Sequence, residues 1–191
     1  MNNTETKQKL LDQLYEPYKQ CLLCPLAKQG RTNVVFGEGN VNSHLMFIGE
    51  GPGREENEQG KPFVGRSGKL LTRLLTIVGI DRQDVFITNI VKCRPPGNRR
   101  PTFEESSTCK KILLLKQIEI INPKIICTLG SCAVENIIEK QVAISKIRGT
   151  CLPWNNRIII PTFHPAYALR NPRVIETMVE DILNAKRKSE I

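Results

Sequence analysis

The chain has 191 residues, of which 40% are hydrophobic, and 28 Lys and Arg against 19 Asp and Glu give it a formal net charge of +9. Residues 1–191 suit a single domain with its own core, and no apolar run is long enough to cross a membrane. The polar start "MNNTETKQKLLDQLYEPYKQ" lacks the apolar region of a secretory signal. We therefore expect a soluble cytoplasmic monomer without a membrane partner. Its basic charge favours a polyanionic partner, although a basic protein without one would have the same composition.

The periodicity of apolar residues places the elements in chain order. Helical spacing predicts helices over residues 4–20, 67–79, 102–122, 131–140 and 172–188. Short apolar runs predict buried strands over residues 44–50, 84–93, 123–130 and 157–163. Ser67 and Gly79 are expected to begin and end the second helix, and Thr102 with Glu105 forms a capping box. The loop "RPPGNRRP" is excluded from regular structure because its prolines lack amide donors.

Strands therefore alternate with helices, and the strands are apolar throughout. That pattern is typical of an α/β fold whose mostly parallel sheet is covered on both faces. Active sites in such folds lie beyond the carboxyl ends of the strands. Here those ends read "GEGPG", "TNIVKC", "TLGSC" and "TFHPAY".

Seven cysteines are present, and an odd number without a secretory signal argues against a disulfide framework. Cys21 and Cys24 share one tight turn, and Cys93 and Cys109 follow from distant places. Four such thiolates can hold zinc or an iron–sulfur cluster, and the spacing leaves both open. Of the remaining three, Cys127 is expected in the core, Cys132 is expected to be buried, and Cys151 is unassigned.

The glycine-rich stretch Gly49–Gly68, "GEGPGREENEQGKPFVGRSG", has the wrong pattern for phosphate binding. It lacks the spacing of a Walker loop and the third glycine of a dinucleotide fingerprint, and its four glutamates would repel a phosphate. We expect it to close around an uncharged ligand. Phe63, in the flexible setting "GKPFVG", is then a candidate platform for stacking a flat heterocycle; the alternative is a loop phenylalanine packed into the core.

Five blocks in order, "CLLCPL", "GEGPGREENEQGKPFVGRSGKLL", "FITNIVKCRPPGNRRP", a cysteine fifteen residues later, and "PTFHPAYALRNP", resemble the family 4, iron–sulfur uracil-DNA glycosylases over residues 21–185. The resemblance implies a three-layer α/β/α sandwich with a central four-stranded parallel sheet. It also implies a [4Fe–4S] cluster, rather than zinc, on Cys21, Cys24, Cys93 and Cys109. The implied activity is monofunctional hydrolysis of the N-glycosidic bond of deoxyuridine in single- and double-stranded DNA, as in base excision repair.

The resemblance also implies a pocket for a flipped-out base. Asn89 would donate to uracil O4 and accept from N3–H, a pattern that cytosine reverses. Phe63 would stack on the ring, and a neutral His164 would donate to O2 as charge develops on the leaving base. A strand-end asparagine and a structural histidine are the alternatives for Asn89 and His164.

Three further positions, Glu50, Gly51 and Glu56, lie in the glycine-rich stretch Gly49–Gly68. The best-known branch of the superfamily has a water-orienting aspartate where this chain has Gly51, so we expect Glu50 to position water or uracil. The hypothesis is a dissociative path, in which the glycosidic bond breaks before water adds. Glu56 is expected near C5 of the base, where it would exclude thymine. The family's "EEED"-like run is "REEN" here, with Arg54 and Asn57 departing from it.

The segment "HPAYALRNP" is expected to contact DNA. Leu169 is the candidate wedge that enters the gap left by the flipped base, with Tyr167 and Arg170 beside it. Basic residues expected at phosphates are Lys92, Arg94, Arg99, Arg100, Arg170 and Arg173. Two other functions stay open: a relative with broader base choice, such as deaminated purines, and a cluster-bearing nucleic-acid-binding module without catalysis.

Overall fold

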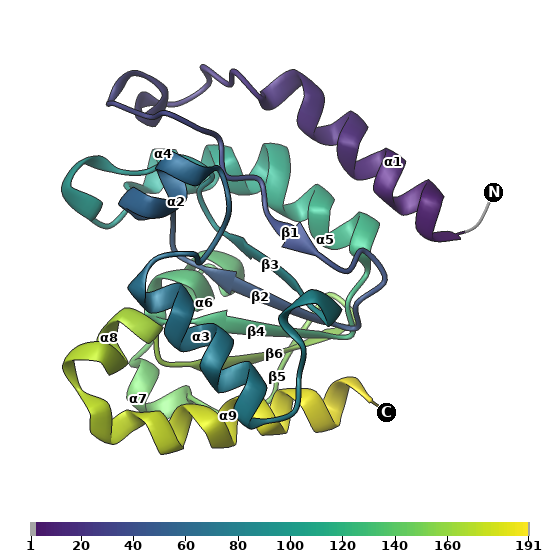
Figure 1. The fold of residues 1–191 in the computed structure, drawn as a ribbon, viewed down its shortest axis with the longest axis vertical. Helices are drawn as coiled ribbons and strands as arrows, with labels where there is room; N and C mark the ends of the chain where they lie inside the picture. Colours follow the sequence, from purple (N-terminus) through teal and green to yellow (C-terminus); the bar gives the residue numbers. More distant parts are fainter. Residues whose placement is uncertain (1–2, 191) are drawn as a thin grey trace.

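The computed structural model describes residues 3–190. A central sheet lies between two layers of helices, with α1, α4 and α5 on one side and α3, α8 and α9 on the other (Figure 1). The helices are α1 (Asn3–Tyr15), α2 (Arg54–Gln59), α3 (Arg66–Ile77), α4 (Phe103–Cys109), α5 (Leu115–Ile121), α6 (Ser131–Ile138), α7 (Ile144–Ile147), α8 (Pro165–Arg170) and α9 (Ile175–Ser189). No helix in this described part is long and apolar enough to cross a membrane.

The strands form one mixed sheet in the order β1-β3-β2-β4-β6-β5. They are β1 (Glu38–Gly39), β2 (Leu45–Gly49), β3 (Phe86–Asn89), β4 (Ile125–Leu129), β5 (Leu152–Trp154) and β6 (Arg157–Thr162). The central four, β3, β2, β4 and β6, are parallel, and β1 and β5 add antiparallel edges. The α/β sandwich with four central parallel strands is therefore confirmed. The whole sheet has six strands, because two short antiparallel edge strands have too few residues to give an apolar run in the sequence.

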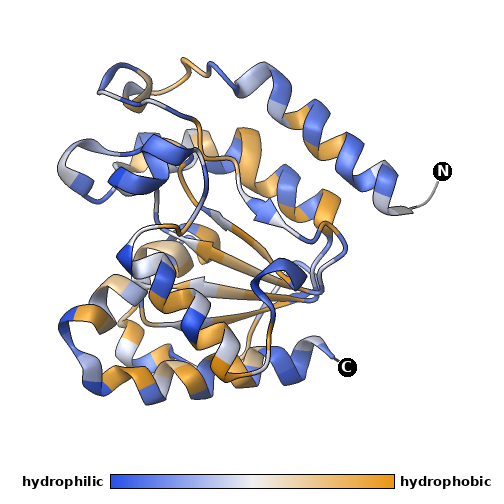
Figure 2. Cartoon of the chain, viewed as in Figure 1, coloured by the Kyte–Doolittle hydropathy of each residue, from blue (hydrophilic) through white to orange (hydrophobic). Residues whose placement is uncertain are grey.

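Each central strand is buried on both faces, as its composition predicts. Leu45 and Phe47 of β2 belong to the cluster under α3 and α9, whereas Met46 and Ile48 belong to the cluster under α1, α5 and α6. Side chains alternate across a strand, so one apolar run supplies both cores. Figure 2 shows the apolar colour along the strands and on the helix faces turned toward them.

The long helix expected over residues 102–122 is interrupted. Thr102 and Glu105 form the expected capping box at the start of α4. A π-helical segment, η5 (Lys110–Leu114), then separates α4 from α5. A π turn carries an extra residue, so α4 and α5 present different faces than one continuous α-helix would.

Two short helices and one cap differ from the prediction. Helix α2 forms inside the glycine-rich stretch and α8 inside "HPAYALRNP", both read from sequence as loops. Helix α3 begins after Gly65, so Ser67 lies inside it and does not cap it. Gly79 does follow its end, with a φ of 68° that suits glycine.

Candidate active site

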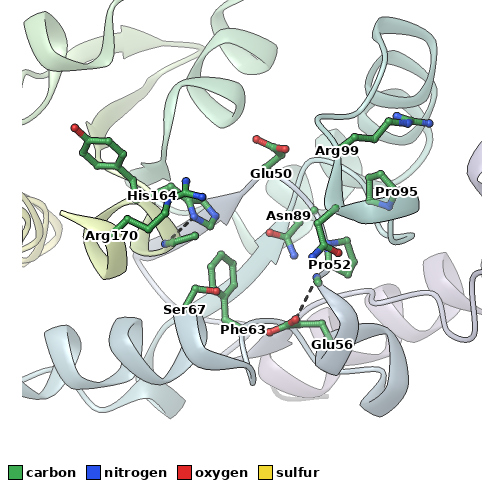
Figure 3. A pocket seen from close by; sticks show the side chains of 15 residues that line it. Glu50, Pro52, Glu56, Phe63, Ser67, Asn89, Pro95, Arg99, His164 and Arg170 are labelled. Atoms are coloured by element: carbon green, nitrogen blue, oxygen red, sulfur yellow. Dashed lines mark hydrogen bonds between the residues drawn. The ribbon is translucent and has the colours of Figure 1, made fainter. Parts of the chain in front are cut away.

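A pocket of about 420 Å³ opens at the carboxyl ends of β2, β3 and β6. The segment after β2 supplies Glu50 and Gly51, β3 supplies Asn89, and the end of β6 leads into His164. The side chains of Asn89, Phe63 and His164 converge on this space in Figure 3. The parallel sheet therefore gathers three of the four strand ends singled out in the sequence, and the fourth contributes Cys132 behind Glu50.

Asn89 forms the floor of the pocket and keeps an unused acceptor. The residue is 1% exposed, and its Oδ1 is buried without a hydrogen-bond partner among residues 3–190. A buried polar atom without a partner costs free energy, so such an atom in a pocket is placed for a ligand. A Cβ added to Gly49 would lie 2.5 Å from this oxygen, so glycine is needed where the strand passes beneath it.

Phe63 lines the pocket and is 6% exposed. Its φ of 50° is unusual for a bulky residue, and strained backbone of this kind persists only where neighbours hold it. One neighbour is Gly68 of α3, where an added Cβ would lie 2.0 Å from the carbonyl of Phe63. The ring centroid is 5.9 Å from that of His164. The ring packs in the core cluster, as the alternative for Phe63 expected, and it also lines the pocket, so its stacking role stays a prediction.

Glu56 lines the pocket, yet its carboxylate is committed to the surrounding loop. Oε1 accepts from the amides of Val64 (2.9 Å) and Gly65 (2.7 Å), and Oε2 accepts from that of Gly53 (3.1 Å). These charge-assisted bonds join the first turn of α2 to the residues that follow Phe63. The Glu56 carboxylate thus accepts from three main-chain amides, and this explains why the glycine-rich stretch of a basic protein carries an acidic residue at this position.

His164 is the N-cap of α8, and its Nδ1 accepts from the amide of Ala166 at 3.1 Å. Burial, together with the charge of Arg170, lowers the pKa of His164 to about 4. The imidazole is therefore neutral near pH 7. Because Nδ1 accepts, the ring proton lies on Nε2, which makes Nε2 a hydrogen-bond donor.

Glu50 is half-buried at the pocket wall, and burial raises the pKa of its carboxyl group. The neighbouring Cys132 side chain and the charge of Arg100 lower the pKa of Glu50 and so partly oppose the effect of burial. Arg100 in turn forms an ion pair with Glu135 of α6. The role of Cys132 was missed, because only the fold brings the start of α6 behind Glu50.

Helix α8 forms one rim of the pocket. Tyr167 and Arg170 line it, and Leu169 is 39% exposed beside them. Arg99 lines the opposite side but donates to both oxygens of Glu105, at 2.8 and 2.7 Å. Arg94 donates to Asn98 and stays outside the pocket lining.

Comparisons with known proteins agree with this geometry. The family model described as the Uracil DNA glycosylase superfamily matches residues 36–186. A type-4 uracil-DNA glycosylase of Thermotoga maritima is 50% identical, over 95% of this chain and 95% of its own. Those of Saccharolobus solfataricus (45%; 92% of this chain and 85% of its own) and Sulfurisphaera tokodaii (44%; 90% and 81%) are also similar.

The chain belongs to the type-4 uracil-DNA glycosylases. The resemblance read from the five sequence blocks is thereby confirmed.

In this type-4 uracil-DNA glycosylase, the four cysteines of the sequence blocks lie in one region. Cys93 and Cys109 are in the core cluster under α1 and α5, and Cys21 and Cys24 pack against it. Two of these sulfur atoms accept hydrogen bonds. Arg31 Nη1 donates to Cys93 Sγ at 3.6 Å, and the main-chain amide of Lys92 donates to Cys109 Sγ at 3.3 Å. Within residues 3–190, no three His, Cys, Asp or Glu side chains are grouped to hold a single metal ion.

Lys92 was wrongly expected at the DNA phosphates. Its side chain is fully buried, and burial lowers its pKa to about 7. The sequence pattern "IVKCR" placed it beside a basic loop, but Lys92 lies in a bend after β3 and its side chain bonds to buried oxygens. Pocket residues that the sequence did not single out include Ser67, Pro52, Pro95 and Asn98. They are uncharged residues inside the quoted blocks, and their place at the pocket depends on the folding of α2, α3 and the loop after β3.

Proposed function

We propose that the protein is a uracil-DNA glycosylase that hydrolyses the N-glycosidic bond of deoxyuridine in single- and double-stranded DNA, in base excision repair. It releases free uracil and leaves an abasic site. The observation that carries the proposal is the unpartnered Oδ1 of Asn89, buried in a pocket that also presents an aromatic ring and a neutral histidine.

Asn89 reads the base. Its Oδ1 accepts from N3–H of uracil, and its amide nitrogen donates to O4. Cytosine presents an acceptor at N3 and a donor at C4, so both contacts would become repulsive. Phe63 stacks on one face of the extruded ring, which replaces stacking lost from the DNA.

His164 stabilises the leaving group. As the bond between C1′ and N1 breaks, its electron pair moves onto the base, and negative charge accumulates at O2. The Nε2–H group donates to that oxygen, and the neutral imidazole needs no proton from solvent to do so. Arg170 places a positive charge at the same side of the pocket.

Glu50 acts on the sugar and on the attacking water. On a dissociative path the sugar becomes cationic before water adds to C1′, and a carboxylate stabilises that cation. The same carboxylate orients the water and accepts its proton, which leaves the hydroxyl group on C1′. Gly51 has no side chain for this task, and Cys132 neighbours Glu50 and lowers the pKa of its carboxyl group.

Glu56 and the rim complete the site. Through its three amide bonds, Glu56 fixes the loop on the C5 side of the base and so excludes the methyl group of thymine. Leu169 fills the gap in the DNA stack, with Tyr167 beside it. Arg170, Arg94 and Arg99 face the phosphates.

A [4Fe–4S] cluster on Cys21, Cys24, Cys93 and Cys109 fits the donor set. The four thiols lie close enough for their charges to interact, and hydrogen bonds to sulfur, as from Arg31 and Lys92, are typical of such sites. When bound, the cluster would join the 21–24 turn, the loop after β3 and helix α4 as a structural cross-link.

The test is release of uracil from a single-stranded oligonucleotide, revealed by alkaline cleavage at the abasic site. We expect cleavage at uracil and none at cytosine in the same context. His164→Ala should lose at least about 10²-fold in rate. A wild-type protein that binds the oligonucleotide but releases no uracil would be a binding module, and the proposed function would be wrong. An absorbance near 400 nm with about four irons per chain tests the cluster separately.

A further inference from the structure

Lys92 is a fully buried lysine whose side chain ends beneath the base-reading residue. Its Nζ donates to the main-chain oxygen of Asn89 at 2.8 Å, to Oε1 of Gln117 at 2.7 Å and to Oγ1 of Thr88. An ammonium group has three donors, and here all three meet neutral oxygens. All three donors of Lys92 Nζ are therefore used in hydrogen bonds inside the protein.

The partners of Lys92 form a closed network. Gln117 Nε2 and Thr88 Oγ1 both donate to the main-chain oxygen of Phe36, at 2.9 and 2.8 Å. Lys92 thus links the end of β3 to helix α5 and to the segment that precedes β1. Its own main chain is also held, because its amide donates to Cys109 Sγ and its oxygen accepts from Val35 at 2.7 Å.

Asn89 needs such support. Because its Oδ1 has no partner in the described part of the chain, no side-chain bond to that atom fixes the direction of the acceptor. The direction must come from the main chain of β3 and from packing against Gly49. The bond from Lys92 Nζ to the Asn89 carbonyl is a side-chain contact that holds this main chain from below.

We propose that Lys92 is a positioning residue for uracil recognition: with Gln117, it fixes the main chain of Asn89 so that Oδ1 stays directed into the pocket. The inference deepens the proposed function and rests on it. Lys92 touches neither base nor DNA, so its removal should weaken the binding of uracil and leave the contacts to phosphate unchanged.

The experiment uses the full chain with its iron content matched to that of the wild type. For Lys92→Met we measure the Kd of free uracil by calorimetry, the Kd of abasic-site DNA, and kcat and KM on a uracil-containing strand. We expect the uracil Kd to rise about tenfold or more, since three buried hydrogen bonds are lost together. We expect kcat to fall while KM and the abasic-DNA Kd stay within about twofold.

Lys186→Met is the matched control. Lys186 also donates to main-chain oxygens, those of Val78 and Gly79, but at the far end of α3. It should leave all four quantities unchanged. The proposal is overturned if folded Lys92→Met binds uracil with the wild-type Kd. It is also overturned if the Kd of uracil and the Kd of abasic-site DNA rise by the same factor, which would indicate a general disturbance of the fold.

Gln117→Leu keeps the proposal testable if Lys92→Met does not fold. It leaves the lysine and removes one anchor, so the uracil Kd should rise; no change would contradict the proposal. In the double variant, Gln117→Leu should add little to Lys92→Met, because the two residues act as one unit. Failure of the proposed function gives a different result. A wild type that binds free uracil but does not cleave uracil from DNA would contradict the proposed function, and the comparison of uracil Kd values would still test Lys92.

Discussion

Gly49 and Phe63 are in direct contact, and a Cβ added to Gly49 would lie 2.4 Å from Cζ of the Phe63 ring. Real Cβ contacts are not that short, so any side chain at Gly49 must displace the ring. The same Cβ would press on Asn89 Oδ1. One small residue at the end of β2 therefore makes room for both the stacking surface and the acceptor.

We expect Gly49→Ala to lower kcat/KM for uracil release by at least about 10²-fold, because a misplaced site costs far more in rate than in stability. The free energy of unfolding should fall by only about 1–3 kcal/mol, as for other overpacked positions. Denaturant unfolding and single-turnover uracil release check the two numbers. The double variant Gly49→Ala/Phe63→Leu should recover stability without recovering activity; recovery of activity would show that the ring is not needed.

His164 should leave a signature in the pH dependence of stability. Its folded pKa of about 4 lies below its usual value near 6.5, so the folded state prefers the neutral ring. This contribution is present above pH 6.5 and is lost as the pH falls from 6.5 toward 4, where the unfolded chain binds a proton and the folded chain does not. Thermal unfolding of wild type and His164→Gln should therefore diverge in that window, with the wild type losing more stability.

The same pKa predicts the activity profile. The rate of uracil release should not fall between pH 8 and pH 5 through protonation of His164, since the imidazole stays neutral there. An acid limb near pH 6.5 that disappears in His164→Gln would contradict the neutral donor.

Glu56 is expected to matter for stability as well as for base choice. Glu56→Gln leaves one oxygen for three amide donors, so the free energy of unfolding should fall by about 2 kcal/mol. The control is Glu58→Gln on the same helix, whose exposed pair with Arg54 should contribute less than about 1 kcal/mol. Release of thymine from a G·T mismatch by Glu56→Ala tests the role at C5. Uracil activity that stays at the wild-type level would separate Glu56 from the pocket.

Arg170 should contribute to DNA binding through charge. Arg170→Gln should reduce the slope of log K against log salt concentration by about one unit, because one phosphate contact is lost. Fluorescence anisotropy on an abasic-site duplex between low and moderate salt measures the slope. Arg187→Gln, on the exposed end of α9, should not change it. An unchanged slope for both variants would remove Arg170 from the phosphate contacts.

The parallel core was predictable because buried strands need apolar runs that do not alternate, and β2, β4 and β6 have them. The capping box at Thr102 was predictable because its chemistry is local. Helix α2 was not predictable, because "REENEQ" has no apolar stripe. The helix is stabilised instead by the bonds of Glu56 to neighbouring main-chain amides. The burial of Lys92 also escaped prediction, because a charge enters a core only where distant oxygens such as that of Gln117 receive it.

The π-helical segment between α4 and α5 sets the direction in which Cys109 faces. Each residue of an α-helix turns by about 100°, so one residue removed from Lys110–Leu114 would rotate α4 by that angle relative to α5. Cys109 would then face away from Cys93 while Gln117 kept its place under the sheet. The extra residue of the π turn therefore lets one helical run direct Cys109 toward Cys93 and Gln117 toward Lys92.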